Sequence, residues 1–275
     1  MRIVILSSSV YSETACAMTL RLAAMEHIPA GALALSTLNR GTLLRKLGQM
    51  GARKAAHYAR TKLLPQRNKD LPKVQNPYLQ PLLKHEGGVF RSMREVASVY
   101  GFQVATCNDQ NSQDAVAQLR KWSPDLIIFT GGNILRKDLL DVPRLGVLNL
   151  HLGLLPEIRG MSSPEWSLLK HVPVGITIHY IDAGIDAGPI LQRYEFPDTS
   201  ACASLPDLRN RLIAFGIEKV GEVVTALENG TITATPQSTR NEDSQFFVMH
   251  EWLKERAAEL LSKTHTPTAA GTMNG

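Results

Sequence analysis

Short apolar runs alternate with amphipathic helical segments along most of this chain of 275 residues. Apolar, β-branched runs predict strands, and longer segments with apolar residues three and four apart predict helices. The predicted strands are residues 2–6, 31–35, 102–105 and 125–130, and the predicted helices are residues 13–26 and 114–122. This order predicts an α/β fold with a mainly parallel sheet and helices on both of its faces.

Further elements follow in the last third of the chain. Residues 208–227 predict a long helix that ends at Asn229 and Gly230, and the alternation over residues 231–235 predicts a short strand. A final amphipathic helix is predicted from apolar residues at helical spacing, which are Met249, Trp252, Leu253, Ala257, Leu260 and Leu261. We expect Trp252 to belong to the core rather than to a stacking surface.

A strongly basic segment interrupts the alternation. Residues 40–73 hold ten Lys or Arg residues and one acid, Asp70. Their apolar spacing predicts a basic helix, and the prolines that follow predict a loop. We interpret residues 40–85 as an insertion within a catalytic domain of residues 1–240, and residues 241–275 as a C-terminal helical extension with a disordered tail.

Composition narrows the classes of protein that fit. The net charge of +5 and the pI of 9.2 favour anionic ligands without indicating nucleic acid as a partner. The apolar run at the N-terminus is too short for a signal peptide, and no run approaches the roughly 18 apolar residues that a membrane span needs. The three cysteines lie far apart and predict neither a disulfide framework nor a metal site. We expect a cytoplasmic protein.

The chemistry is concentrated in one stretch. Asn149 and His151 stand two residues apart in an apolar run that predicts a strand, and side chains at this spacing point to the same face. A second apolar run, residues 174–180, is followed by the loop DAGIDAG, which carries Asp182 and Asp186. We expect two strand ends to bring together an amide, an imidazole and a carboxylate.

Such a set suits attack on a carbonyl carbon. An amide and a protonated imidazole are donors that could hold the oxyanion of a tetrahedral intermediate. A carboxylate nearby would keep the imidazole charged or take a proton through water. No Ser or Cys nucleophile is evident in the stretch, which favours direct transfer to an incoming amine.

The stretch resembles the folate-dependent formyltransferases, and the resemblance covers roughly residues 95–240. That family has Asn-x-His-x-x-Leu-Leu-Pro-x-x-Arg-Gly, then a Pro and a Trp, then Gly-Val-Thr-Ile-His and a loop of the type Gly-Ile-Asp-Thr-Gly. The corresponding positions here are Asn149, His151, Leu154, Leu155, Pro156, Arg159, Gly160, Pro164, Trp166, Gly175, Thr177, His179, Gly184, Asp186 and Gly188.

The resemblance implies a Rossmann-like fold and a site. By analogy with the family, Asn149, His151 and Asp186 are the catalytic residues, 10-formyltetrahydrofolate is the formyl donor, and no metal takes part. The same analogy predicts a pterin pocket lined by four further residues, which are Ile134, Leu135, Gly184 and Ile185.

Several residues depart from the pattern or stay ambiguous. The family usually has Ser at the position of Gly153, and the serine turn of residues 7–9 lacks the glycines with which glycinamide ribonucleotide formyltransferases hold a phosphate. Arg159 fits either a loop salt bridge or a role in steadying the catalytic loop. We interpret His179 as a packed histidine and Asp182 as a turn carboxylate.

The resemblance leaves several functions open. We favour an N-formyltransferase that acts on the primary amine of a small molecule, such as an amino sugar nucleotide or a related biosynthetic intermediate. The alternatives are a methionyl-tRNA or glycinamide ribonucleotide formyltransferase, a formyltetrahydrofolate hydrolase, and a non-catalytic relative that binds folate or nucleotide. A phosphorylated acceptor and a homodimer are both compatible with the sequence.

Overall fold

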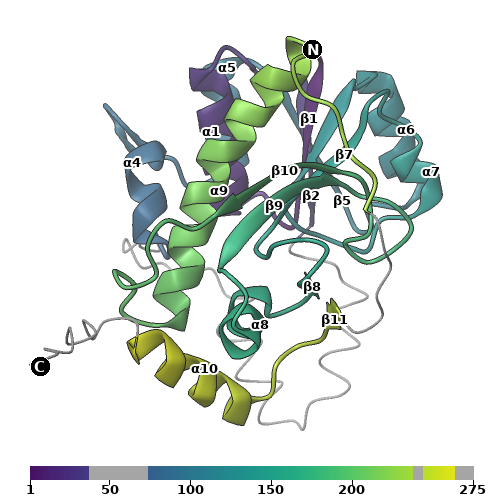
Figure 1. Cartoon of the computed structure of the whole chain (residues 1–275). Coiled ribbons are helices and arrows are strands. Elements are labelled where there is room, and N and C mark those ends of the chain that lie inside the picture. The colour runs from purple at the N-terminus through teal and green to yellow at the C-terminus, as the bar shows by residue number, and fades with distance from the viewer. Residues whose placement is uncertain (37–73, 238–243, 264–275) are drawn as a thin grey trace, which may run out of the picture.

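The computed structural model describes residues 1–36, 74–237 and 244–263, which surround a seven-stranded sheet (Figure 1). The strands are β1 (Ile3–Ser7), β2 (Gly31–Leu35), β5 (Gln103–Cys107), β6 (Leu126–Phe129), β7 (Gly146–His151), β9 (Gly175–Tyr180) and β10 (Ile190–Glu195). Their order in the sheet is β10-β9-β7-β6-β1-β2-β5. The five strands from β5 to β7 are parallel, and β9 runs antiparallel to both of its neighbours. The predicted mainly parallel sheet is confirmed.

Helices cover both faces of the sheet (Figure 1). One face packs against α1 (Glu13–Ala24), α4 (Gln80–Leu83), α5 (Met93–Tyr100) and α9 (Leu205–Glu228), and the other packs against α6 (Gln113–Trp122) and α7 (Lys137–Leu140). Strand β1 shows how the sequence produces these layers. Ile3 and Ile5 face the first group of helices, whereas Val4 and Leu6 face the second, because side chains alternate along a strand.

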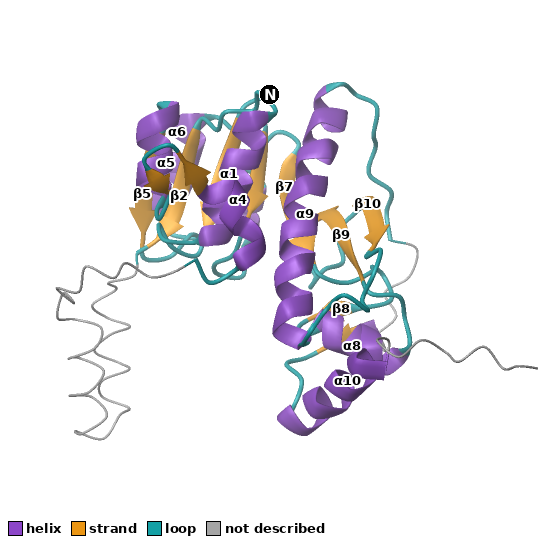
Figure 2. Ribbon diagram, turned by 90° about the vertical axis from the view of Figure 1, so that its left-hand side faces the viewer, coloured by secondary structure: helices purple, strands orange, loops and turns teal. Residues whose placement is uncertain are grey.

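A third core cluster joins the C-terminal extension to the body. Helices α8 (Ser163–Lys170) and α10 (Glu251–Lys263) pack together beside the N-terminal part of α9 (Figure 2). The short strand β8 (Arg159–Gly160) pairs with β11 (Gln245–Phe246) in parallel. The remaining elements are a 3-10 turn, η1 (Pro77–Leu79), and a hairpin of β3 (Lys84–His85) and β4 (Gly88–Val89).

Serine side chains begin four of the helices. Ser12, Ser92, Ser112 and Ser204 each accept a hydrogen bond from the backbone N–H three residues later, at the starts of α1, α5, α6 and α9. Such N-caps satisfy donors that the first turn of a helix leaves free. Helix α5 ends at Gly101 in the left-handed conformation, a common helix stop.

The structure corrects some of the predicted elements. Residues 231–235 do not form a strand, since only Thr235 makes an isolated bridge, to Ile190. Trp252 is 70% exposed and not part of the core. It precedes the buried Ala257 by five residues, which turns it about 140° around the helix from the packed face.

Some predictions fall on parts of the chain that the structure does not describe. The basic helix in residues 40–73 and the disordered tail of residues 264–275 lie outside the described residues. None of the helices within the described ranges combines the length and apolar character that a membrane span requires.

A buried carboxylate links α8 to α9. We expect the free energy of unfolding to fall when this carboxylate loses its partner. Glu165 is 7% exposed and accepts two hydrogen bonds, of 2.9 and 2.8 Å, from Nη2 of Arg209. Arg209→Met leaves this carboxylate unpaired, so we expect the free energy of unfolding in urea to fall by about 2 kcal/mol, a value discounted because Arg209 is partly exposed. The exposed pair of Arg193 and Glu157 provides the control, and Arg193→Met should cost less than about 1 kcal/mol. Equal losses for the two variants would contradict the prediction.

Candidate active site

Asn149 and His151 occupy the end of β7, as the sequence predicts, and both side chains lie on one face of the sheet. The Asn149 amide nitrogen Nδ2 is 3.1 Å from Nε2 of His179, and Nε2 of the buried His151 is 2.7 Å from the Ile158 carbonyl oxygen. The amide and the imidazole are therefore held by definite partners in this structure.

Asp186 reaches the same place by a route that the sequence did not indicate. Because β9 is antiparallel to β7, its last residue, Tyr180, lies opposite Leu148 rather than at the end of β7. The loop after β9 folds back, which brings the Asp186 carboxylate within 3.4 Å of Nδ1 of His151 and 3.5 Å of Nε2 of His179. Asn149, His151 and Asp186 lie together as expected, but Asp186 reaches the other two from a folded loop and not from a second strand end.

The loop holds Asp186 in a constrained conformation. Its φ of +47° lies in the left-handed region, which Asp tolerates better than most residues. The Gly160 amide donates a 2.8 Å hydrogen bond to Oδ2 of Asp186, and Nε2 of Gln237 donates to the Asp186 and Gly188 carbonyl oxygens at 3.0 and 2.7 Å. Hydrogen bonds therefore hold both the backbone and the side chain of Asp186 in place.

His179 is a site residue that sequence reasoning missed. We interpreted it as a packed histidine, and it is indeed buried, but it faces Asn149 and Asp186. The register of β7 and β9 explains this, because Asn149 lies directly opposite His179 and opposed residues project to the same face. A prediction that the two apolar runs pair antiparallel would have placed His179 beside Asn149.

Hydrogen-bond partners define where the protons of the site lie. A carbonyl oxygen can only accept, so Nε2 of His151 donates to Ile158, and Nδ1 of His179 donates to the Tyr180 carbonyl at 2.8 Å. When the His179 ring is neutral, its Nε2 accepts a hydrogen bond from the Asn149 amide. The Asn149 amide nitrogen carries a second proton that it can donate to a substrate oxygen.

Burial and nearby charges shift the pKa values of both His151 and Asp186. Burial lowers the pKa of His151, the Asp186 carboxylate opposes this and the His179 ring adds to it, and the pKa stays below its ordinary value. Burial raises the pKa of Asp186, but its contacts with His179, His151 and the Gly160 amide outweigh burial, and the pKa lies below its usual range. The lowered pKa of Asp186 favours its carboxylate form, and the lowered pKa of His151 opposes the protonated imidazole expected from the sequence.

The absence of a side chain at Gly153 gives His151 its position. A Cβ at residue 153 would lie 2.9 Å from Nε2 of His151 and 3.0 Å from both the Ile158 oxygen and the Ser163 Cβ. The loop around Gly153 is fixed by Thr177, whose hydroxyl donates to the Gly153 carbonyl at 2.7 Å. The departure from Ser at this position therefore leaves room for the contact between His151 and Ile158.

The four residues predicted for a pterin pocket differ in their surroundings. Ile134 is 86% exposed and Ile185 is 51% exposed, each in a loop. Leu135 is buried and packs into the core cluster under α6 and α7. Gly184 donates its N–H to the Asp182 carboxylate at 2.8 Å, which agrees with the interpretation of Asp182 as a turn residue.

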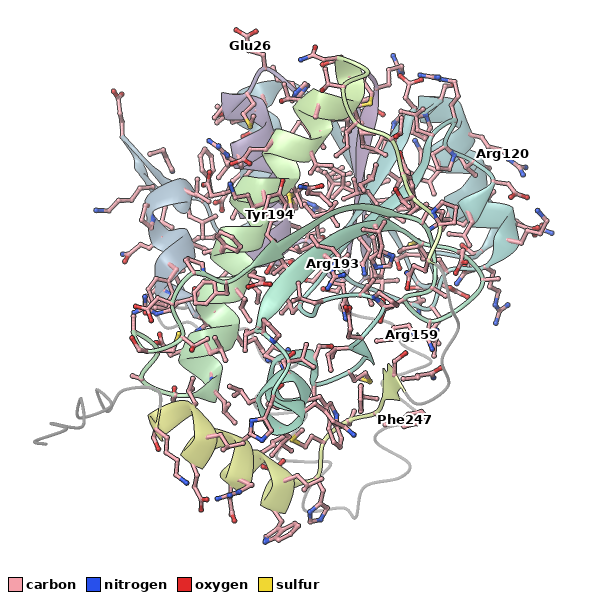
Figure 3. The ribbon with its side chains drawn as sticks, viewed as in Figure 1. Glu26, Arg120, Arg159, Arg193, Tyr194 and Phe247 are labelled. Carbon is pink, nitrogen blue, oxygen red and sulfur yellow. The ribbon has the colours of Figure 1, made fainter. Side chains whose placement is uncertain are left out.

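Arg159 and the serine turn of residues 7–9 are both held by hydrogen bonds. Arg159 is buried and donates from Nε to the Ser244 hydroxyl at 3.1 Å, and Figure 3 shows it on the side of the molecule that carries Phe247. In the serine turn the Ser7 hydroxyl donates to the Ser9 carbonyl at 2.8 Å, and the Ser9 hydroxyl accepts from the Tyr11 amide at 3.1 Å. The serine turn thus uses these hydroxyls for its own conformation.

Comparison with known proteins places the chain among its relatives. The formyl transferase family model matches residues 73–223. The methionyl-tRNA formyltransferase of Ruminiclostridium cellulolyticum is 34% identical over 147 residues, which are 53% of this chain and 47% of that protein. The matched segment spans about half the length of the curated relatives.

Solved structures share the fold at low sequence identity. A sugar N-formyltransferase from Shewanella sp. aligns with a TM-score of 0.54 at 15% identity, covering 90% of this chain and 77% of the other. A phosphoribosylglycinamide formyltransferase from Anaplasma phagocytophilum aligns with a TM-score of 0.54 at 16% identity, covering 90% and 99%. The expected Rossmann-like fold is confirmed, and the family match over more than half of its length shows that the chain belongs to the formyl transferase family.

Proposed function

We propose that this protein transfers a formyl group from 10-formyltetrahydrofolate to the primary amine of a small molecule. The observation that carries the proposal is the convergence of Asn149, His151 and Asp186, with the carboxylate 3.4 Å from the imidazole and the amide on the same strand. An amide donor, an imidazole donor and a partly buried carboxylate supply what acyl transfer to an amine needs.

In the proposed reaction, the neutral amine attacks the formyl carbon and the carbonyl oxygen becomes an oxyanion. The free proton of the Asn149 amide and the Nε2 proton of His151 bind this oxygen. His151 exchanges the Ile158 carbonyl for the oxyanion because a charged acceptor forms the stronger hydrogen bond. Asp186 takes the proton that the amine loses and returns it to N10 of the folate as the carbon–nitrogen bond breaks. The products are a formamide and tetrahydrofolate.

The state of the cysteines supports direct transfer over a covalent intermediate. Burial raises the pKa of Cys16 to about 12, with Glu95 and Glu13 adding to the rise, and burial raises the pKa of Cys107 to about 11. Burial also raises the pKa of Cys202. All three side chains are therefore thiols near neutral pH, and a thiol is a much weaker nucleophile than a thiolate.

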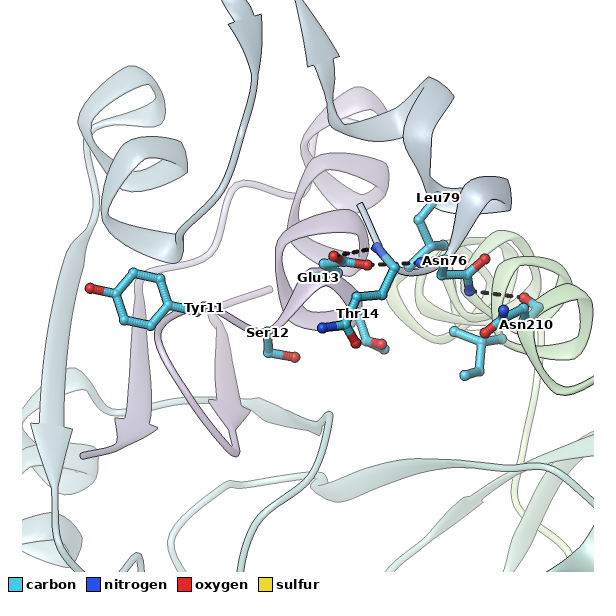
Figure 4. A pocket seen from close by; sticks show the side chains of 9 residues that line it. Tyr11, Ser12, Glu13, Thr14, Asn76, Leu79 and Asn210 are labelled. Atoms are coloured by element: carbon cyan, nitrogen blue, oxygen red, sulfur yellow. Dashed lines mark hydrogen bonds between the residues drawn. The ribbon is translucent and has the colours of Figure 1, made fainter. Parts of the chain in front are cut away.

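A pocket of mixed polar and apolar lining beside α1 supports a sugar as part of the acceptor (Figure 4). The pocket has a volume of about 280 Å³, and part of its lining, residues 11–14, belongs to the segment that follows β1. Ligands of such folds bind at the carboxyl ends of the parallel strands. Its lining includes hydroxyl, amide and carboxylate groups, from Ser12, Thr14, Asn76, Asn210 and Glu13.

The charge of the described residues that line this pocket disfavours a phosphate inside it. Among the described lining residues the ionisable carboxylate is that of Glu13, which already accepts hydrogen bonds from the backbone N–H groups of Gln75 and Asn76, at 2.7 and 3.1 Å. A phosphate would meet the negative charge of Glu13 at the positive end of α1. Sugar hydroxyls, which donate and accept hydrogen bonds, suit the same groups. These features suit the sugar part of an acceptor better than its phosphate.

A panel of acceptors tests the proposed function. The full chain is incubated with 10-formyltetrahydrofolate and amino sugar nucleotides, glycinamide ribonucleotide or methionyl-tRNA, and tetrahydrofolate release and the formylated product are measured. We expect release with amino sugars together with a stoichiometric formamide product. Release without any amine would indicate hydrolysis instead, and no release with any acceptor would favour a binding protein.

A prediction about His179 follows from its hydrogen bond to Asn149. His179→Ala removes the acceptor that orients the amide, so we expect kcat to fall about tenfold to a hundredfold. The conservative variant His179→Gln retains an acceptor and should recover part of the loss. Initial rates at saturating donor measure both variants. Equal loss in the two would show that His179 does not act by orienting Asn149.

A further inference from the structure

The C-terminal extension reaches the catalytic loop through a very short pair of strands. Strand β11 lies along β8 (Figure 1), with Phe246 opposite Gly160 and Gln245 opposite Arg159. The Phe246 carbonyl also accepts a 3.0 Å hydrogen bond from the Met161 amide. This pairing brings a segment of the extension next to the loop that follows the catalytic strand.

Gly160 connects this pairing to the carboxylate of Asp186. Its amide donates to Oδ2 of Asp186 at 2.8 Å, while on its other side a Cβ would overlap the Phe246 carbonyl oxygen. Its φ of +92° is one that side-chain-bearing residues rarely adopt. The Gly160 peptide is therefore confined between β11 and Asp186, and a shift of β11 would move the amide that holds the carboxylate.

Side chains on α8 hold β11 in place. The Phe246 ring stacks on the Trp166 indole with centroids 4.9 Å apart and an interplanar angle of 27°, and the Lys170 ammonium lies 5.7 Å from the Phe246 centroid. Nε1 of Trp166 donates to the Phe247 carbonyl at 3.0 Å. The neighbouring Phe247 side chain, in contrast, is 71% exposed. The position of β11 thus depends on the ring of Phe246 and on the backbone of Phe247. It does not depend on the ring of Phe247.

We propose that β11 is a positioning element of the active site, in which Phe246 acts through Gly160 to hold the Asp186 carboxylate between His151 and His179. The proposal rests on formyl transfer as the proposed function. Phe246 is a positioning residue and not a catalytic one, because its effect passes through the Gly160 amide. The catalytic unit proposed for residues 1–240 then needs residues 244–247 of the extension for full activity.

Two matched variants in the full chain separate positioning from simple packing. Phe246→Ala removes the ring that stacks on Trp166, whereas Phe247→Ala removes an exposed ring and keeps the backbone contact with Trp166. For Phe246→Ala we expect kcat to fall about tenfold to a hundredfold, the range that a small misplacement of a catalytic group produces, with KM unchanged for donor and acceptor. Phe247→Ala should match the wild type, and Phe246→Tyr, which retains the ring, should restore most of kcat.

A spectroscopic measurement tests the same idea without turnover. The pKa of His151 is measured by NMR of its ring nitrogens as pH is varied, in the wild type and both alanine variants. Asp186 raises the pKa of His151, so a carboxylate that turns away should let this pKa fall in Phe246→Ala and leave it unchanged in Phe247→Ala.

The outcomes distinguish the proposals. Lower thermal stability of Phe246→Ala with unchanged kcat and an unchanged His151 pKa would overturn the positioning role, since the ring would then serve packing alone. If the wild type transfers formyl to no acceptor, the proposed function fails, and the NMR titration by itself decides whether β11 positions Asp186.

Discussion

Asp186→Asn is expected to lower kcat for formyl transfer about a hundredfold to ten-thousandfold, the range associated with loss of a positioned acid or base. The reason is that an amide has nearly the shape of the carboxylate but cannot take a proton from the attacking amine. The side chain is 16% exposed and lies between two histidines, so water does not readily replace it. Tetrahydrofolate release at saturating donor and acceptor measures the loss.

The fold should tolerate this change. An asparagine oxygen can still accept the hydrogen bond from the Gly160 amide, and Gln237 binds the backbone of residue 186 and not its side chain. The same loop offers a control in Asp182, whose carboxylate accepts from the Gly184 amide. The kcat of Asp182→Asn should equal that of the wild type. Near wild-type turnover by Asp186→Asn would remove the carboxylate from the mechanism.

Because the pKa of Asp186 is lowered, the effect of Asp186→Asn on the free energy of unfolding should depend on pH. A carboxylate whose folded-state pKa lies below its ordinary value stabilises the native state above that ordinary value, near pH 4, and the contribution is lost as pH falls through the folded-state pKa. Asp186→Asn lacks this contribution. Its free energy of unfolding should therefore change less with pH between about pH 5 and pH 3 than that of the wild type.

The sequence predicts most of the fold because its signals are local and repeated. Each strand of the parallel sheet is a short apolar run, and four of the helices begin at a serine that caps them, such as Ser12 or Ser204. Where a signal was weak, the prediction failed. Residues 231–235 alternate like a strand, but only Thr235 meets a partner, so alternation alone did not produce a strand.

The site could be predicted only in part, for a physical reason. Asn149 and His151 share one strand, so their relation follows from the alternation of side chains along it. The contact of His179 with Asn149 depends on the register between β7 and β9, and that of Phe246 with Gly160 depends on the pairing of two-residue strands. Such pairings are set by tertiary packing across distant segments, and no local pattern encodes them.

His151→Ala is the second change with a large expected effect. Removing one donor to a developing oxyanion typically costs about a hundredfold to a thousandfold in kcat, and we expect a loss in that range. His85→Ala provides a control in an exposed hairpin away from the site. Circular dichroism should show the same fold in both variants. Retention of near wild-type kcat by His151→Ala would contradict the assignment of the site.

The pKa of His151 adds a test that does not depend on turnover. Because burial lowers this pKa below the ordinary value near 6.5, the unfolded chain binds the proton before the native state does as pH falls. Below about pH 6.5 the unfolded chain is protonated at His151 while the native state is not, which lowers the free energy of unfolding. This loss of stability grows as pH falls, until the folded-state pKa is reached. His151→Ala removes this loss, so its free energy of unfolding, measured in urea, should fall less between about pH 7 and pH 5 than that of the wild type. A steeper fall in the variant would mean that Asp186 holds the imidazole charged, and the oxyanion would then meet an imidazolium rather than a neutral ring.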